Sequence, residues 1–155
     1  MSPVFSATLL ILRVLLGALF MVSGFTKLAG PPENFLSVVR AYEILGQTAS
    51  AAAAAILPWL EFIGGVFVFL GLWLRRSLVF LWVLNTVFIG VLISAFLRKL
   101  PLRDCGCFGE YLSIPPDKML FLDLALWACF LVLVIFSTRA GVLSLDRFFG
   151  GKSVR

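Results

Sequence analysis

The stretch FVFLGLWLRRSLVFLWVL, residues 67–84, consists of two apolar runs that meet at two adjacent arginines. On either side of the arginines these runs extend into two apolar segments, at about 53–74 and 77–97. Each is long enough to cross a bilayer core, which requires about 20 helical residues at a rise of about 1.5 Å each. Because only Leu74-Arg75-Arg76 joins them, the sequence predicts a tight transmembrane hairpin.

Two further apolar segments, at about 8–28 and 118–137, flank this hairpin. The 155 residues are 61% hydrophobic and only 14% charged, which exceeds the apolar content of a soluble domain. The first segment contains Arg13 and is not followed by a small-x-small cleavage site, so we interpret it as a retained anchor. The predicted fold is an all-α integral membrane protein, a single domain over residues 1–155 with a bundle of four transmembrane helices.

The connections between the segments predict the topology. Loops of about 20 residues follow the first and third segments, so both emerge on one face, opposite the two termini and Arg75-Arg76. Lysine and arginine are almost equally divided between the faces, and the arginines of the tight turn favour their own face as cytoplasmic. We therefore expect a bacterial-type inner membrane protein with cytoplasmic termini and an extracytoplasmic loop at 98–117. The net charge of +5 suits anionic lipid, and no nucleic-acid binding is expected.

The first long loop contains ENFLSVVRAYEIL, residues 33–45, with apolar residues spaced three and four apart. This pattern predicts a short helix that lies in the membrane surface, between Pro31-Pro32 and Gly46. Two interpretations stay open: a plain interfacial strap, or a cover for the second long loop. The residues of the apolar face are Phe35, Val38, Val39, Tyr42 and Leu45.

The second long loop contains RDCGCFGEY, residues 103–111, between Pro101 and Pro115-Pro116. Cys105 and Cys107 can form a disulfide if the chain bends between them, and Gly106 permits that bend. So small a ring is strained, and strain raises the reduction potential. The spacing therefore favours a disulfide that exchanges electrons over one that stabilises a fold.

Two alternatives for these cysteines are an inert pair of thiols and a metal site. Exposed paired cysteines outside the cytoplasm normally oxidise, which disfavours inert thiols. The chain has no histidine, and the third cysteine, Cys129, falls well inside the fourth helix as a packed core thiol, so no metal is expected. The lack of histidine also excludes bis-histidine haem and Ser-His or Cys-His catalysis.

Ionisable residues inside a membrane are costly and need a partner or a function. Lys27 ends the first helix, Glu61 lies one turn inside the second if Pro58 is its first membrane residue, and Asp123 is about two turns into the fourth. We expect these charges to converge beneath the cysteine loop. A structural interpretation has Lys27 pair with a carboxylate to fix helix packing, and a functional one has Glu61 or Asp123 relay protons.

Other polar and small residues suggest packing roles. Gly64 and Gly65 share the face of Glu61 and would let a neighbouring helix approach closely, as would Gly17 and Gly24 on the first helix. We expect Arg13 to extend to lipid headgroups and Asn85 to form an interhelical hydrogen bond.

The motif Cys105-Gly106-Cys107-Phe108-Gly109, placed between the third and fourth helices, resembles that of the MauE-type branch of the DoxX-like membrane proteins. RVLLGALFMVSGFTKL (13–28), and PWLE (58–61) followed by two glycines, are similar to the first and second helices of that group. The resemblance implies a four-helix protein of periplasmic disulfide chemistry, acting beside a thioredoxin-like partner while a disulfide-rich enzyme matures. Through its DoxX relatives, the resemblance also implies a connection with quinone reduction and thiosulfate oxidation. The chain departs from the pattern at Leu122, where a basic residue usually precedes the position of Asp123.

Together these features predict a membrane thiol–disulfide oxidoreductase. Cys107 would attack, Cys105 would resolve, and electrons would pass between an extracytoplasmic thioredoxin-like protein, or a maturing disulfide-containing enzyme, and the membrane, with a quinone as candidate cofactor. One alternative is a non-catalytic scaffold for a maturation complex. Another is a small transporter, motivated by the polar residues Glu61, Asp123 and Asn85 and disfavoured by the lack of a broken-helix repeat. The supporting residues are Gly106, Phe108, Gly109, Lys27, Glu61 and Asp123.

Overall fold

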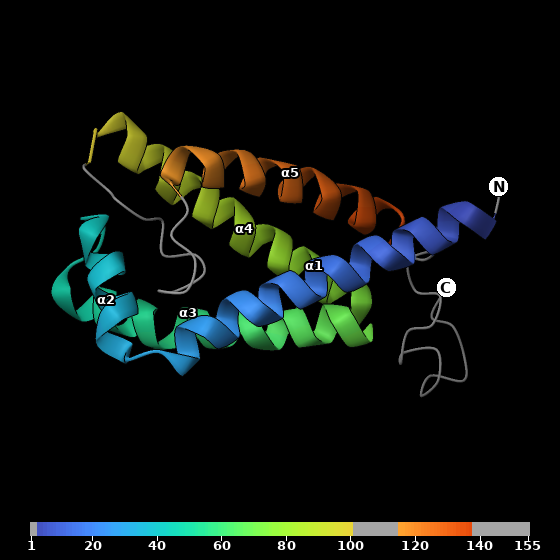
Figure 1. Cartoon of the computed structure of the whole chain (residues 1–155), viewed down its shortest axis with the longest axis horizontal. Helices are drawn as coiled ribbons and strands as arrows, with labels where there is room; N and C mark the ends of the chain where they lie inside the picture. The colour runs from blue at the N-terminus through green and yellow to red at the C-terminus, as the bar shows by residue number, and fades with distance from the viewer. Residues whose placement is uncertain (1–2, 101–114, 138–155) are drawn as a thin grey trace.

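The structure, a computed structural model, describes residues 3–100 and 115–137. These residues form five α-helices and no strand (Figure 1). Four of the helices are long and apolar enough to cross a membrane, so the predicted four-helix membrane fold is confirmed and the protein is a multi-pass membrane protein. The helices are α1 Pro3–Ala29, α2 Pro32–Ala41, α3 Gln47–Leu70, α4 Leu74–Leu97 and α5 Pro116–Ile135.

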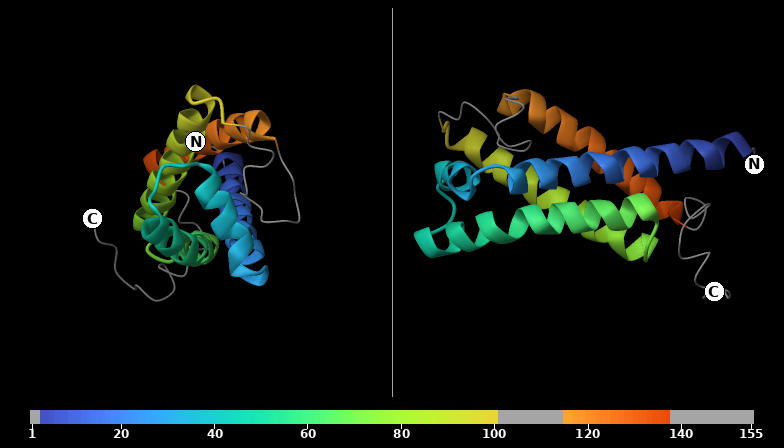
Figure 2. Two further views of the ribbon diagram at one scale, coloured as in Figure 1. Left: turned by 90° about the vertical axis from the view of Figure 1, so that its left-hand side faces the viewer. Right: turned by 60° about the horizontal axis from the view of Figure 1, so that its bottom comes forward.

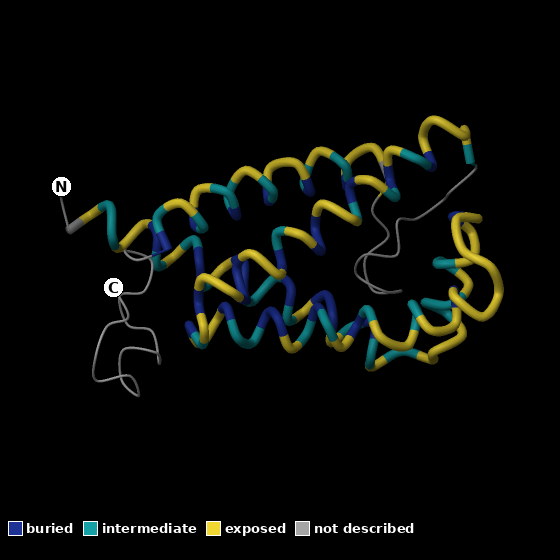
Figure 3. Tube along the Cα trace, turned by 180° about the vertical axis from the view of Figure 1, so that it is seen from behind, coloured by how far each residue is buried: buried dark blue, intermediate teal, exposed yellow. Residues whose placement is uncertain are grey.

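The outer surface of the bundle is apolar, as a lipid-facing surface must be. Leu15, Val83, Phe121 and Ile135 are each more than half exposed. Buried positions instead face inward between the helices, and Figure 3 shows exposed and buried residues alternating along each long helix. Several of the buried side chains are polar or charged, which in a bilayer keeps them away from lipid.

Helices α1 and α3 touch backbone to backbone through glycines. A Cβ added at Gly24 would lie 2.5 Å from the backbone nitrogen of Phe62, and one added at Gly65 would lie 2.5 Å from that of Met21. At Gly17 the corresponding distance to the α3 backbone is 2.6 Å. Small residues let membrane helices approach in this way, and the close approach predicted from these glycines is confirmed.

Helices α4 and α5 are held together by larger side chains. The rings of Trp82 and Trp127 lie 5.4 Å apart between centroids, and the indole nitrogen of Trp127 donates to the hydroxyl of Thr86 at 3.1 Å. Asn85 donates from its side-chain amide to the backbone carbonyl of Asp123 at 2.9 Å, as predicted for an interhelical hydrogen bond. Large interlocking side chains therefore replace the glycine contacts of the other pair.

A sharp turn joins α3 to α4 and so brings the α1–α3 pair and the α4–α5 pair together at one end of the bundle. Gly71 ends α3 in the left-handed conformation (φ 72°), and Leu72 donates its N–H to the carbonyl of Phe67. Arg75 and Arg76 fall in the first turn of α4, so the prediction that they form the connection was wrong. Gly71 ends α3 before the chain reaches Arg75 and Arg76, which belong to α4.

The bundle is closed at this turn and open at the other end. Figure 2 shows α3 and α4 leaving the turn together and diverging toward the end that carries α2, as they also do in Figure 1. The pairs meet near the middle, where the rings of Phe20 and Phe130 pack edge to face at 5.4 Å. The diverging end is where the polar residues and α2 gather.

Helix α2 lies across this open end and is shorter than the predicted 33–45. It ends at Ala41, because Glu43 takes a positive φ of 51° and turns the chain toward α3. Arg98, which caps the end of α4, donates hydrogen bonds to the carbonyls of Tyr42 and Glu43 and ties the end of α2 to α4. Helix α3 begins at Gln47, earlier than the predicted 53, because the alanines at 51–55 are strong helix formers.

Candidate functional site at the open end of the bundle

A buried ion pair links α1 and α3 at this end. The Nζ of Lys27 lies 2.6 Å from both carboxylate oxygens of Glu61, and the two side chains are 3% and 0% exposed. Ser23 donates its hydroxyl to the Oε2 of Glu61 at 2.8 Å and lies 3.3 Å from the Lys27 nitrogen. Sequence reasoning missed Ser23, although it precedes Lys27 by four residues and so shares its helical face.

Glu61 lies much deeper in its helix than predicted. Helix α3 begins at Gln47 instead of the predicted 53 and continues through Pro58. Glu61 is 14 residues beyond Gln47, which corresponds to about 21 Å of helix. The carboxylate is therefore held inside the bundle, and its stability there depends on Lys27.

Asp123 lies near this pair without joining it. It is 2% exposed and lies on α5. Within the described residues, its Oδ2 has no hydrogen-bond partner, and neither has the Oδ1 of Asn85, whose amide reaches the Asp123 backbone from α4. The predicted convergence of the three charges is observed as one bonded pair with a separate carboxylate from α5.

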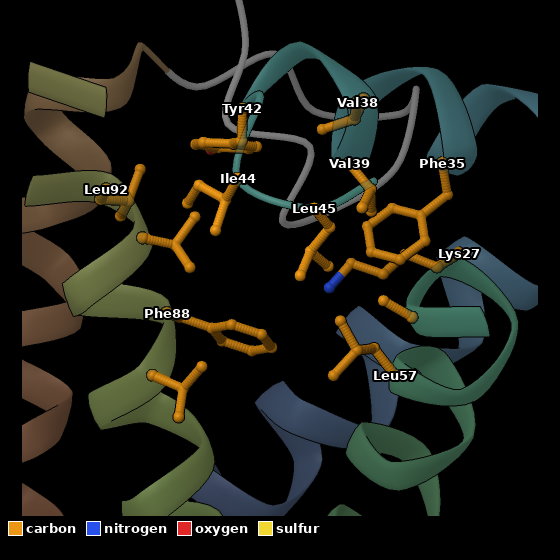
Figure 4. Close-up of a pocket in the computed structure, with 13 residues that line it drawn as sticks. Lys27, Phe35, Val38, Val39, Tyr42, Ile44, Leu45, Leu57, Phe88 and Leu92 are labelled. Atoms are coloured by element: carbon orange, nitrogen blue, oxygen red, sulfur yellow. The ribbon is translucent and has the colours of Figure 1, made fainter. Parts of the chain in front are cut away.

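A cavity of about 360 Å³ lies beneath α2, between α3 and α4 (Figure 4). In Figure 4 the nitrogen of Lys27 points into the space between the rings of Phe35 on α2 and Phe88 on α4. It lies 5.2 Å from the centre of the first ring and 5.6 Å from that of the second, within the range of cation–π attraction. Sequence reasoning did not find this cavity, because it depends on how α2 crosses the diverging helices.

The cysteine motif, residues 105–109, lies outside the described residues, so its predicted roles stay predictions. The described residues on either side of it are Leu100, which follows α4, and Pro115, which precedes α5. Leu100 packs beside Tyr42 and Met119 in a small apolar cluster at the same end as α2. The anchors of the cysteine segment, Lys27 and the cavity therefore lie at one end of the bundle, and Glu61 contacts Lys27 from deeper in α3.

The comparison with protein-family models matches residues 5–139 of the chain to the family described as methylamine utilisation protein MauE. The chain belongs to the MauE family. The match covers the four candidate spans, apart from Val4 at the start of the first, and the segment that holds the cysteines. Neither the curated proteins nor the solved structures gave a match.

In this MauE-family protein two other residues can be compared with their predictions. Arg13 was expected to extend to lipid headgroups and is instead 2% exposed, facing the interior of the bundle from α1. Arg13 is buried because it lies on the same face of α1 as the buried residues Leu9, Leu16 and Phe20. Cys129 is a free, half-buried thiol packed against the main apolar core, in line with the prediction.

The open end of this MauE-family bundle can support chemistry that moves protons or apolar molecules. It offers two carboxylates, one ammonium group and an apolar cavity inside the membrane-spanning region. In residues 3–100 and 115–137, no group of three or more His, Cys, Asp or Glu residues could hold a metal ion.

Proposed function

We propose that this MauE-family protein is a membrane thiol–disulfide oxidoreductase in which Cys105 and Cys107 cycle between a dithiol and a disulfide. Its partner is an extracytoplasmic thioredoxin-like protein or a maturing disulfide-containing enzyme, and it resides in a bacterial-type inner membrane with the cysteines on the outer side. The family supports a role in methylamine utilisation. The closely spaced cysteines support the chemistry, because a dithiol can act without histidine or metal.

The observation that carries the proposal is the placement of buried charge at the end where the cysteine segment is anchored. Cys105 is five residues beyond Leu100, so the two Cα atoms are separated by no more than about 18 Å. Ionisable groups inside a membrane are rare and mark functional paths. Glu61 and Asp123 are thus suitably located to accept or supply the protons that accompany a dithiol.

The exchange itself requires only sulfur chemistry. The Cys107 thiolate attacks a disulfide of the partner, forms a mixed disulfide and expels one partner thiolate. Cys105, once deprotonated, attacks Cys107, closes the ring and expels the second partner thiolate. Two electrons pass to the partner, whose thiolates take up the two protons lost by the pair, and the reverse sequence oxidises the partner. Gly106 gives the ring its bend, with Phe108 and Gly109 as supporting residues.

The reduction potential of the Cys105–Cys107 pair tests this proposal. The full-length protein, carrying Cys129→Ser so that only the pair is counted, would be equilibrated with glutathione or dithiothreitol buffers and its alkylated thiols measured by mass. We expect a potential above about −250 mV, in the range of exchanging pairs. A disulfide that stays intact below about −300 mV, or thiols that never pair, would contradict catalysis.

A non-catalytic scaffold is the second candidate, and the ion pair is the observation that favours it. Lys27 and Glu61 satisfy each other completely with the help of Ser23, so packing alone accounts for them. Replacing both cysteines by serine separates the two functions in a complementation assay. The scaffold would still support growth on methylamine, whereas the oxidoreductase would not.

A further inference from the structure

A groove of about 240 Å³ lies between α3 and α4, on the side of the closed turn from which the two helices leave together (Figure 2). We propose that this groove binds one phospholipid with an anionic headgroup, whose phosphate contacts Arg76 and whose acyl chain lies against α3 and α4. The proposal goes beyond the cysteine chemistry, because the groove is at the end of the bundle opposite to α2 and the anchors of the cysteine segment.

The apolar part of the groove is open to lipid. Its walls are Leu60, Ile63 and Phe67 from α3 and Phe80 from α4. Ile63 and Phe80 are 45% and 41% exposed, and the buried Gly64 adds no side chain to the lining. A space left empty loses dispersion contacts, which an acyl chain from the surrounding bilayer supplies.

Charge and apolar surface follow each other along the groove in the order in which they occur in a phospholipid. Arg76 lies in the first turn of α4, next to the turn that ends α3. Leu60 instead precedes Leu70, the last residue of α3, by ten residues, which corresponds to about 15 Å of helix. The groove therefore offers a cation at the end of the spanning helices and apolar side chains deeper in the membrane.

Trp73 marks the depth of the headgroup region. Its side chain is 67% exposed, and its ring packs edge to face against that of Phe67 at 6.4 Å between centroids. Tryptophan is enriched where the membrane meets water, because its ring is apolar and its N–H is polar. Arg76 follows Trp73 by three residues and so lies at the level of lipid phosphates.

The Arg76 guanidinium is free to bind a headgroup. Arg76 is exposed, and within the residues that the structure describes its side chain makes no hydrogen bond or ion pair. Ser77, the other polar residue of the groove, already donates its hydroxyl to the carbonyl of Leu72 at 2.8 Å. A guanidinium suits a phosphate because its planar fork can donate two parallel hydrogen bonds.

The charge around the groove favours an anionic lipid over a zwitterionic one. The acidic residues that the structure describes are all remote from the turn: Glu33, Glu43 and Asp117 lie at the open end, and Glu61 and Asp123 are buried inside the bundle. Among the described residues, the positive charges of Arg75 and Arg76 are therefore unbalanced. Basic sites between membrane helices select lipids with anionic headgroups.

The direct test is the binding of dioleoylphosphatidylglycerol to the full-length protein in detergent, with bound lipids counted by native mass spectrometry. Arg76→Gln removes the cation of the groove. Its matched control, Arg75→Gln, makes the same change of charge at the adjacent exposed residue, which does not line the groove. We expect about tenfold weaker binding in Arg76→Gln, the loss of a hydrogen bond to a charged group, and a change within about twofold in Arg75→Gln. Equal losses in both variants would show attraction by net charge alone and overturn the site.

The acyl chain has its own test on α3. Ile63→Trp fills the groove, whereas Ile56→Trp places the same ring on an exposed position of the same helix outside the groove. We expect about tenfold weaker binding of dioleoylphosphatidylglycerol in Ile63→Trp, equivalent to the loss of contacts with two methylene groups, and no loss in Ile56→Trp. Both positions face lipid, so neither ring enters the core. Unchanged binding in Ile63→Trp would contradict an acyl chain in the groove.

Competition separates a phospholipid site from a simple anion site. We expect dioleoylphosphatidylcholine to bind about fivefold more weakly than dioleoylphosphatidylglycerol, and inorganic phosphate not to displace the bound lipid. Equal binding of the two lipids, or displacement by phosphate, would contradict the proposal. None of these measurements involves the cysteine pair, so they succeed or fail separately from the reduction-potential test of the proposed function.

Discussion

The two helix pairs of this bundle are built by opposite means. In the α1–α3 pair, Gly24 and Gly65 bring backbones into contact, and the Lys27–Glu61 ion pair closes the interface. In the α4–α5 pair, tryptophan rings and the Asn85 amide span the gap. The first interface leaves no room for a methyl group, whereas the second consists of side chains with rotamers of their own.

This difference indicates which of the two interfaces tolerates substitution. Backbone contact fixes the distance between two helices, because no side chain lies between them to adjust. Interlocked side chains can repack at modest cost. We therefore expect α1 and α3 to behave as one rigid unit and α4 and α5 to adjust around a ligand, a partner or a substitution.

The largest effect should come from Lys27→Met, which strands the Glu61 carboxylate in the α1–α3 interface. Removing one partner of a buried pair costs about 3–5 kcal/mol of folding free energy. Thermal unfolding in detergent micelles measures the loss, with the exposed Lys118→Met as control. The double variant Lys27→Met/Glu61→Gln should recover most of it, and failure to recover would mean that the pair is not what holds α1 to α3.

Gly24→Ala should follow, because its methyl group would collide with the α3 backbone. Overpacking of this kind costs about 1–3 kcal/mol. Gly90 on α4 is the matched control, since an added Cβ there meets nothing within 4 Å, and Gly90→Ala should be neutral or slightly stabilising. Equal unfolding temperatures for the two variants would remove the distinction between the helix pairs.

Arg98→Gln should have a local effect on α2. The guanidinium holds the carbonyls of Tyr42 and Glu43 at the end of that helix, and loss of such a bond should increase local opening about fivefold. Amide hydrogen exchange of residues 33–41, compared with that of α3 as an internal reference, measures it. An unchanged α2 would show that its apolar face alone holds it in place.

Asn85→Leu should have the smallest effect. Interhelical hydrogen bonds in membranes contribute about 0.6 kcal/mol on average, and leucine keeps the volume of the position close to that of asparagine. Unfolding in micelles should shift only slightly, with Thr86→Val as a neighbouring comparison. A loss above about 2 kcal/mol would place Asn85 in a larger polar network with Asp123.

The fold could be read from the sequence because length and hydropathy alone specify spanning helices. The pairing of Lys27 could not, since Glu61 and Asp123 were both eligible and the choice depends on glycines that draw α3 against α1. The depth of Glu61 was misjudged because Pro58 was considered as the first membrane residue of the second segment. A proline inside a helix leaves no local signal that distinguishes it from one at the beginning.

The candidate site was predictable only in its residues and not in its shape. Buried charges were visible as exceptions in apolar segments, and Asn85 was recognisable for the same reason. The cavity depends on the end of α2 at Ala41 and on the divergence of α3 from α4, which are properties of tertiary packing. Arg13 shows the same limit, because its distance from the helix end suggested lipid while its face is the core face.

The turn at residues 71–73 fixes the angle between α3 and α4. Helices α3 and α4 are each 24 residues long, or about 36 Å, and they meet at a glycine followed closely by Trp73, a non-glycine residue with a positive φ of 41°. If the two helices are treated as rigid rods joined at this turn, a rotation of about 5° there would move their far ends by about 3 Å. Substitutions at Gly71 would therefore change the width of the cavity at the opposite end of the bundle.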